Sequence, residues 1–222
     1  MKKLIACAVA AVAAVSMATA EITVGVRGIF GVGLGTTLAD DMDSFDLDLG
    51  GTLNVGGTVF VKIPLVASLV VQPEVGFTYN MVGMKGDLGY GAYAAYAIEE
   101  KIDCSYKAID IPVLVGWDFK INDSFTVTPL VGPKISIPVG KLATETEVSG
   151  GGVSAKEDDD FDIDSSVLFS IVVGAGVAYK VGPGAIVGDL RYNIGISSLA
   201  LESGDVATPR GLQLSVGYQI SF

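Results

Sequence analysis

The end of the chain, residues 211–222, reads GLQLSVGYQISF. Apolar side chains occupy every second position from Leu212 to Phe222, and Gln, Ser and Gly stand between them. Successive side chains of a β-strand point to opposite faces of the sheet, so this alternation predicts a strand with one apolar and one polar face. Because a tilted strand of about 9–11 residues crosses a lipid bilayer, the segment is long enough to span a membrane.

Seven earlier segments repeat this pattern. In the last of them, for example, Leu190 and Tyr192 lie on the apolar face while Asp189 and Arg191 lie on the other. The predicted strands cover residues 22–35, 51–63, 68–83, 105–120, 125–139, 165–180, 185–198 and 211–222. The pattern predicts an all-β fold, a transmembrane antiparallel up-and-down β-barrel of eight strands, with apolar side chains toward lipid and polar side chains toward the lumen.

The composition supports a membrane barrel. Mean hydropathy is +0.54, yet after Val15 no run of residues approaches the roughly 20 apolar positions that a membrane helix needs. Inside lipid every backbone polar group must be paired, and a closed barrel is the other structure that achieves this. The alternative is a soluble lipocalin-like barrel, whose outer face would be rich in Lys and Glu. Here the polar face is mainly Gly, Ser, Thr and Asn, which favours a crowded interior.

The connections between the predicted strands alternate in length. Short ones fall near 64–67, 121–124 and 181–184, and long ones at 36–50, 84–104, 140–164 and 199–210. Outer-membrane barrels have short periplasmic turns and longer external loops. We therefore expect the cell outer membrane as the location, with extracellular long loops and with both termini in the periplasm.

Four prolines fall inside the predicted strands. They are Pro73, Pro112, Pro129 and Pro133. Proline cannot donate a hydrogen bond to the ladder, so each is interpreted as a β-bulge, an irregularity that bends a strand.

Residues 1–20 have the features of a secretory signal peptide. Lys2 and Lys3 precede an uncharged apolar stretch that ends at Val15, and Ala18-Thr19-Ala20 fits a small-x-small cleavage site. The alternative is an N-terminal membrane anchor, but the apolar stretch is short for a span. We expect a cleaved signal peptide at 1–20 and an outer-membrane β-barrel over 21–222.

Several stretches resemble a known family. They read VQPEVG at 71–76, IDIPVLVG at 109–116 and FSIVVGAGVAY at 169–179. With them the chain resembles the outer-membrane β-barrel domain family, which includes PorT-like proteins and small eight-stranded barrels. The terminal YQISF is similar to the signal read by the barrel-insertion machinery, which implies that Tyr218 and Phe222 carry an assembly signal. The resemblance covers nearly all of residues 21–222 and implies architecture rather than chemistry.

Acidic residues gather in the predicted loops. Loss of Lys2 and Lys3 with the signal peptide would change the net charge from −11 to −13. The densest acidic run is Glu157, Asp158, Asp159, Asp160, Asp162 and Asp164. Clustered carboxylates can hold a divalent cation such as Ca²⁺, although this run does not match an EF-hand loop. The other interpretation is a solvated loop that its charge keeps soluble.

Charged residues also fall at lumen positions of the predicted strands. They are Arg27, Glu74, Asp110, Lys134, Asp189 and Arg191, three cations and three anions. A barrel of eight strands has room only for its own side chains, and buried charges must pair. We expect Arg27, Glu74, Asp189 and Arg191 at one depth, and Lys134 paired with Asp110 nearer the outer rim. The group is either a salt-bridged plug, which we favour, or a selectivity element for ions.

The residue types exclude most enzyme chemistry. The chain has no histidine, which removes Ser-His-Asp catalysis and histidine acid–base or metal chemistry. Cys104 therefore has no histidine partner, no cofactor is expected, and net acidity argues against nucleic acid. We expect a non-enzymatic structural or surface-interaction protein with acidic external loops. The alternative is a narrow passive pore for small solutes or cations. Expected partners are outer-membrane lipid, the barrel-insertion machinery, and an extracellular ligand or divalent cations at the loops.

Overall fold

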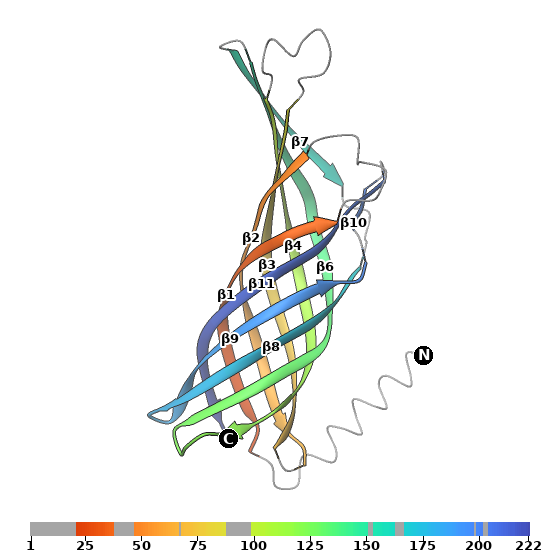
Figure 1. The fold of residues 1–222 in the computed structure, drawn as a ribbon. Helices are drawn as coiled ribbons and strands as arrows, with labels where there is room; N and C mark the ends of the chain where they lie inside the picture. The colour runs from red at the N-terminus through yellow and green to blue at the C-terminus, as the bar shows by residue number, and fades with distance from the viewer. Residues whose placement is uncertain are drawn as a thin grey trace, which may run out of the picture.

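Eight long antiparallel strands close into a barrel, as the sequence predicts. The computed structural model describes residues 21–37, 47–66, 68–87, 99–150, 153–162, 167–197, 199–201 and 204–222. The barrel strands are β1 (Thr23–Thr37), β2 (Leu47–Pro64), β3 (Leu69–Asp87), β4 (Glu99–Trp117), β6 (Phe125–Gly150), β8 (Leu168–Val181), β9 (Gly184–Gly195) and β11 (Gly204–Ser221). Each strand pairs with the next in this order, and β11 pairs with β1 to close the sheet (Figure 1).

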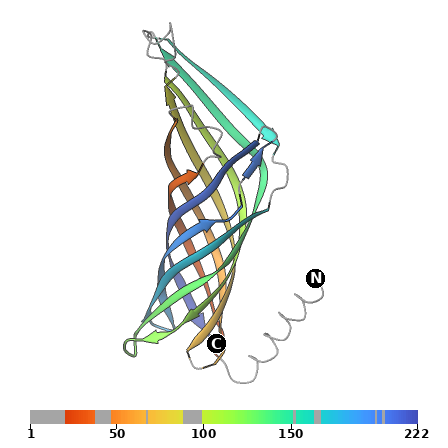
Figure 2. The same ribbon diagram turned by 45° about the vertical axis from the view of Figure 1, so that its right-hand side comes forward.

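Three short strands extend the same sheet. β5 (Phe119–Lys120) pairs with β6, β7 (Val153–Asp162) pairs with the far part of β6, and β10 (Leu199–Leu201) pairs with β11. Figure 2 shows β6 and β7 rising at one side of the molecule, where β3 and β4 rise with them, since Glu99 of β4 pairs with Ser149 of β6 and with Asp87 of β3. We call this side of the molecule the extended end.

The prediction of long loops is wrong for much of their length. Residues 47–50, 84–87, 99–104, 140–150, 153–162 and 204–210 belong to strands. Apolar alternation arises only where one face of a strand meets lipid and the other a packed lumen. Backbone pairing needs no such contrast, so the ladders continue after the sequence pattern has stopped. Residues 38–46, 88–98 and 163–166 lie outside the described residues, as does the expected signal peptide at 1–20.

The opposite side of the barrel, which we call the turn end, has the predicted short connections. They fall at residues 65–68, 121–124 and 182–183, and Gly182 adopts a left-handed φ of +61° that a tight turn requires. The amide of Phe222 donates a hydrogen bond of 2.9 Å to the carbonyl of Ile22. The start of β1 and the end of β11 therefore meet at the turn end.

The register of the paired residues fixes the tilt of the strands. One path of directly paired residues runs Val187, Gly217, Arg27, Thr58, Gly76, Asp110, Ser136, Leu168. Ser170 of β8 pairs with Gly195 of β9, and in the same register Leu168 lies opposite Ser197. The path therefore returns to the line of β9 at Ser197, ten residues beyond its start at Val187. A shift of ten residues around eight strands requires tilted strands, and each step to the next strand climbs by about 1.25 residues.

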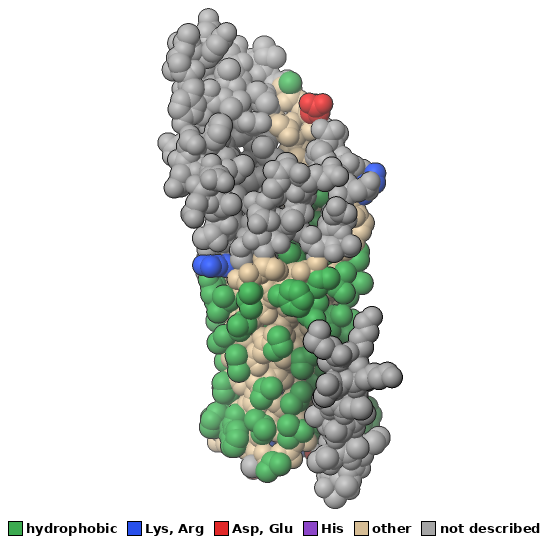
Figure 3. Space-filling model, turned by 90° about the vertical axis from the view of Figure 1, so that its right-hand side faces the viewer, with side chains coloured by type: hydrophobic (Ala, Val, Ile, Leu, Met, Phe, Trp, Pro, Cys, Tyr) green, Lys and Arg blue, Asp and Glu red, His purple; other side chains and the backbone are tan. Residues whose placement is uncertain are grey.

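The two faces of the sheet differ as the sequence predicts. On β8, outward-facing Phe169 and Val173 are 49% and 45% exposed, whereas inward-facing Ser170 and Val172 are 4% and 1% exposed. Figure 3 shows outward apolar side chains covering the wall of the barrel near the turn end. We call this band the apolar belt; on β1 it runs from Val24 to Val32. None of the described residues forms a helix long and apolar enough to cross a membrane.

The interpretation of the strand prolines as bulges is wrong. Pairing keeps one register across Pro73 and Pro112, and Pro129 and Pro133 pair directly with Ala175 and Ile171. Register shifts occur instead near Gly33, Leu49, Ser105 and Leu199. The ladder thus accommodates a missing amide donor without an extra residue.

Candidate functional site

Four charged side chains meet inside the barrel. Arg27 comes from β1, Glu74 from β3, and Asp189 and Arg191 from β9, and all four are buried. We call these four residues the charged layer. Each stands at the position in its strand that faces the lumen, so the parity of the sequence pattern already places it inside.

The tilt of the strands brings these residues to one depth. The residue of β3 level with Arg27 in the pairing path is Gly76. Two steps around the barrel climb by about 2.5 residues, so the residue at the same depth as Arg27 lies near Glu74. Along the pairing path, Ser197 of β9 is six steps around the barrel from Arg27. Six steps climb by about 7.5 residues, so the residue of β9 at the depth of Arg27 lies between Asp189 and Arg191.

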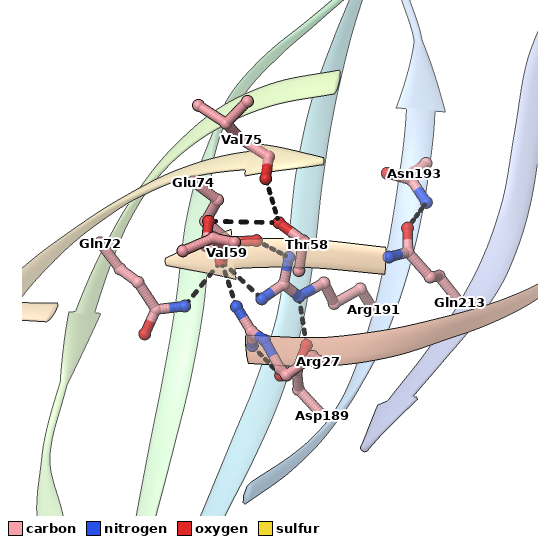
Figure 4. A network of polar contacts seen from close by, with 10 residues as sticks. All are labelled: Arg27, Thr58, Val59, Gln72, Glu74, Val75, Asp189, Arg191, Asn193 and Gln213. Atoms are coloured by element: carbon pink, nitrogen blue, oxygen red, sulfur yellow. Dashed lines mark hydrogen bonds and ion pairs between the residues drawn. The ribbon is translucent and has the colours of Figure 1, made fainter. Parts of the chain in front are cut away.

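The charged layer forms a closed network of ion pairs (Figure 4). Arg27 Nη2 lies 2.6 Å from Glu74 Oε1, and Arg27 Nη1 donates to Asp189. Arg191 donates to Glu74 through two bonds of 3.0 and 2.8 Å and also contacts Asp189 through Nε. Gln72 adds a hydrogen bond of 2.7 Å to Glu74. Two cations balance two anions, which makes burial of all four tolerable because each charge has two opposite partners.

Glycines make room for the two arginines. A Cβ atom added at Gly174 would lie 3.0 Å from Arg191 Cγ, and one added at Gly217 would lie 2.6 Å from Arg27 Cγ. The aliphatic stems therefore lie against bare backbone. The guanidinium carbon of Arg27 lies 4.1 Å from the centroid of the Phe60 ring, which adds a cation–π contact.

The remaining wall at this depth is apolar. Leu114 of β4, Leu130 of β6 and Val172 of β8 pack together and are at most 4% exposed. The same tilt correction that aligns the charged layer places these three near the depth of Arg27, across the lumen. The lumen is filled here by ion pairs on one side and by apolar contacts on the other.

A second ion pair lies nearer the turn end. Lys62 Nζ is 2.6 Å from Asp118 Oδ1, and Thr128 donates a hydrogen bond of 2.6 Å to the same oxygen. Sequence parity places Lys62 and Asp118 toward the lumen. Thr128 could have been found as well, because β6 alternates in the same way.

On the extended-end side of the charged layer, Asp110 forms the expected ion pair with Lys134 and has two further partners. Lys134 Nζ lies 3.9 Å from Asp110 Oδ1, a long contact. Ser136 donates a hydrogen bond of 2.5 Å and Thr78 one of 3.1 Å to the same carboxylate. The two hydroxyls were missed because uncharged lumen residues are too common to single out, although Ser136 is the direct partner of Asp110 on β6.

The acidic run considered either as a solvated loop or as a divalent-cation loop lies for most of its length in a strand. Residues 157–162 belong to β7 and pair with β6, and Asp164 lies outside the described residues. The described residues contain no group of three or more metal-ligating side chains. Beside this run, Lys156 pairs with Glu145 at 2.9 Å and with Glu147 at 3.4 Å. The hydrogen bond from Lys156 to Glu145, followed by the charge of that carboxylate, raises the pKa of Lys156.

The expected assembly residues lie at the turn end. The hydroxyl of Tyr218 donates a hydrogen bond of 3.2 Å to the carbonyl of Val181. The side chain of Phe222 is 78% exposed. Phe222 therefore contributes little packing within the barrel itself.

A closed eight-stranded barrel with an apolar outer belt and polar residues inside defines a transmembrane β-barrel protein. The model of the family described as "Outer membrane protein beta-barrel domain" matches residues 5–219. The chain belongs to this family, and its location is the outer membrane. No curated protein matches the sequence.

Several solved structures are similar to this chain. Neisserial surface protein A has 14% identity and a TM-score of 0.43, with 90% of this chain and 97% of that chain covered. Ail, the attachment invasion locus protein of Yersinia pestis, has 16% identity and a TM-score of 0.36, with the same coverage. The N-terminal β-barrel domain of Pseudomonas aeruginosa OprF has 10% identity and a TM-score of 0.36, covering 91% of this chain and 100% of that chain.

Proposed function

We propose that this protein is a non-conducting, non-enzymatic barrel that anchors a surface structure in the outer membrane. The observation that carries the proposal is the filled lumen at the charged layer. Ions would have to break the pairs among Arg27, Glu74, Asp189 and Arg191 or cross the contact of Leu114, Leu130 and Val172. Either route costs several kcal/mol, because the first leaves buried charges unpaired and the second removes ions from water.

The proposed orientation puts the turn end in the periplasm and the extended end outside the cell. The short turns, the start of β1 and the end of β11 all lie at one side, which supports this arrangement, since outer-membrane barrels keep their short turns in the periplasm. The extended end would then present β6, β7 and their acidic residues to the surroundings. A surface partner there would be selected by negative charge; divalent cations and basic macromolecules fit that description.

Two features support a non-enzymatic role. The chain contains no histidine. The buried carboxylates of Glu74 and Asp189 are each held by two arginines, so neither is open to a substrate. The charged layer is thus better suited to fixing the barrel than to chemistry.

Conductance across a planar lipid bilayer tests the proposal. We expect purified residues 21–222 to insert without resolved current steps in concentrated KCl, whereas a porin inserted in the same bilayer conducts. Insertion is verified separately by the heat-dependent mobility shift of the folded barrel. Stable unitary currents from the inserted protein would contradict the proposal and favour the narrow passive pore for small solutes or cations.

A further inference from the structure

The described cations fall into two groups. Five form ion pairs, either in the lumen or on the β6–β7 hairpin: Arg27, Lys62, Lys134, Lys156 and Arg191. Among the described side chains, five others are exposed and have no ion-pair partner: Lys107, Lys120, Lys141, Lys180 and Arg210. The unpaired group is unexpected, because the chain carries 25 acidic residues against 14 basic ones.

The unpaired cations Lys107 and Lys141 lie on neighbouring strands at the outer wall. Lys107 of β4 pairs directly with Val139 of β6, two residues before Lys141. Both side chains are exposed and follow the outward parity of their strands. Towards the turn end, the next outward pair on these strands is Ile109 and Ile137, so the two lysines border the apolar belt.

A β-bulge in β6 presents Lys141 on this wall. Val139 pairs with Lys107 and Ala143 with Ser105, so three residues of β6 stand opposite Tyr106 alone. Gly140 begins the bulge with a φ of +85°, which glycine adopts without strain. Beyond it Leu142 is only 4% exposed, while Lys141 is exposed. Bulges redirect side chains in this way.

An aromatic ring completes the patch. Tyr79 of β3 pairs directly with Lys107 and shares its outward face, and Phe77, the next outward residue of β3 toward the belt, is 49% exposed. Tyrosine rings favour the depth at which lipid headgroups begin. We call Tyr79, Lys107 and Lys141 the basic rim patch. Acids also lie nearby: Asp162 of β7 pairs directly with Lys141 in the backbone ladder, and Glu145 and Glu147, farther out on β6, are held by Lys156.

We propose that Lys107 and Lys141 bind the phosphate of an anionic lipid whose acyl chains lie against the apolar belt below them. Two adjacent ammonium groups without protein partners match the charge of one phosphate, and the apolar wall provides the surface for the chains. A lipid meets both requirements at once, whereas a free anion would use only the lysines. The assignment to the outer leaflet rests on the proposed orientation, but binding in detergent does not.

Native mass spectrometry of purified residues 21–222 in a neutral detergent tests the proposal. Dioleoylphosphatidylglycerol is the anionic probe and dioleoylphosphatidylcholine the zwitterionic one, each added at the same concentration. We expect K107Q/K141Q to lower retention of the anionic lipid by about tenfold, since each lysine near a lipid surface contributes favourably. Retention of the zwitterionic lipid should change little. K107R/K141R should retain the anionic lipid, because it keeps both charges.

K156Q is the matched control, since it removes a lysine that is paired with acids away from the belt. Equal lipid loss in K156Q and K107Q/K141Q, or no loss in the double variant, would overturn the proposal. The proposal would also be overturned if inorganic phosphate protected the folded barrel against unfolding as strongly as the anionic lipid does. That result would indicate a site for a free anion. If the lysine variants lose lipid binding but still do not conduct, the proposal of a non-conducting barrel is unaffected. The lipid-binding proposal and the proposed function can therefore fail independently.

Discussion

Arg191 and Glu74 face each other through two parallel hydrogen bonds, Nη1 to Oε2 at 3.0 Å and Nη2 to Oε1 at 2.8 Å. This bidentate geometry fixes the plane of the guanidinium as well as its distance. The same carboxylate reaches Arg27 at 2.6 Å, so Glu74 links the two arginines of the charged layer. Under the proposed function, we expect this link to help keep the lumen closed to ions.

Truncation of one side chain of the charged layer should lower the free energy of unfolding, because it leaves a buried charge without one of its partners. In Arg191→Ala the two carboxylates share Arg27 alone, and we expect a loss of about 3–5 kcal/mol in the free energy of unfolding. We also expect measurable conductance, because the truncated side chain leaves a polar gap. Urea unfolding followed by the heat-dependent gel shift measures the first effect and a planar bilayer the second.

The exposed pair on the β6–β7 hairpin provides the control. Glu145 is half exposed and pairs with Lys156, so Glu145→Gln should change stability by less than about 0.5 kcal/mol. An Arg191→Ala protein that unfolds like wild type and does not conduct would rule out the charged layer as a plug.

Removal of both members of the pair should cost less than the two single losses combined. In R191A/E74A the remaining Arg27 and Asp189 still contact each other, one cation against one anion. We expect a coupling free energy of about 1–3 kcal/mol between positions 191 and 74, obtained from a double-mutant cycle in urea. Additive losses would mean that the two side chains are stabilised independently by other neighbours.

The charged layer shows how far sequence reasoning reaches. Arg27, Glu74, Asp189 and Arg191 could be selected because parity puts them inside and because each lies a similar number of residues from the turn end. The apolar half of the same level could not be found in this way. Leu114 and Val172 break the polar character of the lumen face, and their meeting with Leu130 depends on the ten-residue stagger, which no local pattern records.

The extended end shows a second limit. Residues 153–162 read VSAKEDDDFD, a composition typical of a solvated loop. Their pairing with β6 comes from a neighbouring strand rather than from any apolar face of their own, so the hydropathy pattern carries no signal for it. Fold class and strand number were predictable for the opposite reason, because lipid imposes a strict alternation on every strand that crosses it.

Glycine at position 217 should be required for the charged layer to form. A Cβ atom there overlaps the carbonyl of Val26 and lies 2.6 Å from Arg27 Cγ. We expect Gly217→Ala to lower the free energy of unfolding by about 1–3 kcal/mol, since backbone cannot move aside without disturbing the ladder. Gly28 is the matched control, because its Cβ would meet no atom closer than 3.9 Å. Equal stability of G217A and G28A in urea would contradict this account.

Cys104 should react slowly with thiol reagents at neutral pH. It lies on β4 beyond the apolar belt, toward the extended end, with its Sγ atom 3.8 Å from Thr144 Oγ1. Burial raises the pKa of its thiol above the ordinary value of 9.0. The thiolate is the reactive form, so the rate should keep rising with pH beyond the point at which a free cysteine reaches its maximum.

Thr144→Val should shift this profile further toward high pH, because the Thr144 hydroxyl lowers the pKa of Cys104. Absorbance on reaction with a disulfide reagent gives both profiles, using residues 21–222 so that Cys104 is the one thiol present. A half-maximal rate at or below the pH of a free cysteine would refute the burial of the thiol.

Deletion of Phe222 should separate assembly from stability. Its side chain is 78% exposed, and its place in the barrel is held by a backbone hydrogen bond to Ile22. Phe222→Ala keeps that amide, so the urea midpoint of protein refolded in detergent should match wild type, because little buried surface is lost. In cells we expect less folded barrel from both the deletion and Phe222→Ala, because the aromatic end is proposed to be read by the insertion machinery. Gel shift of outer-membrane fractions measures the folded share. Wild-type levels of folded Phe222→Ala in the membrane would refute the assembly role, and a lowered urea midpoint would place the effect in barrel stability instead.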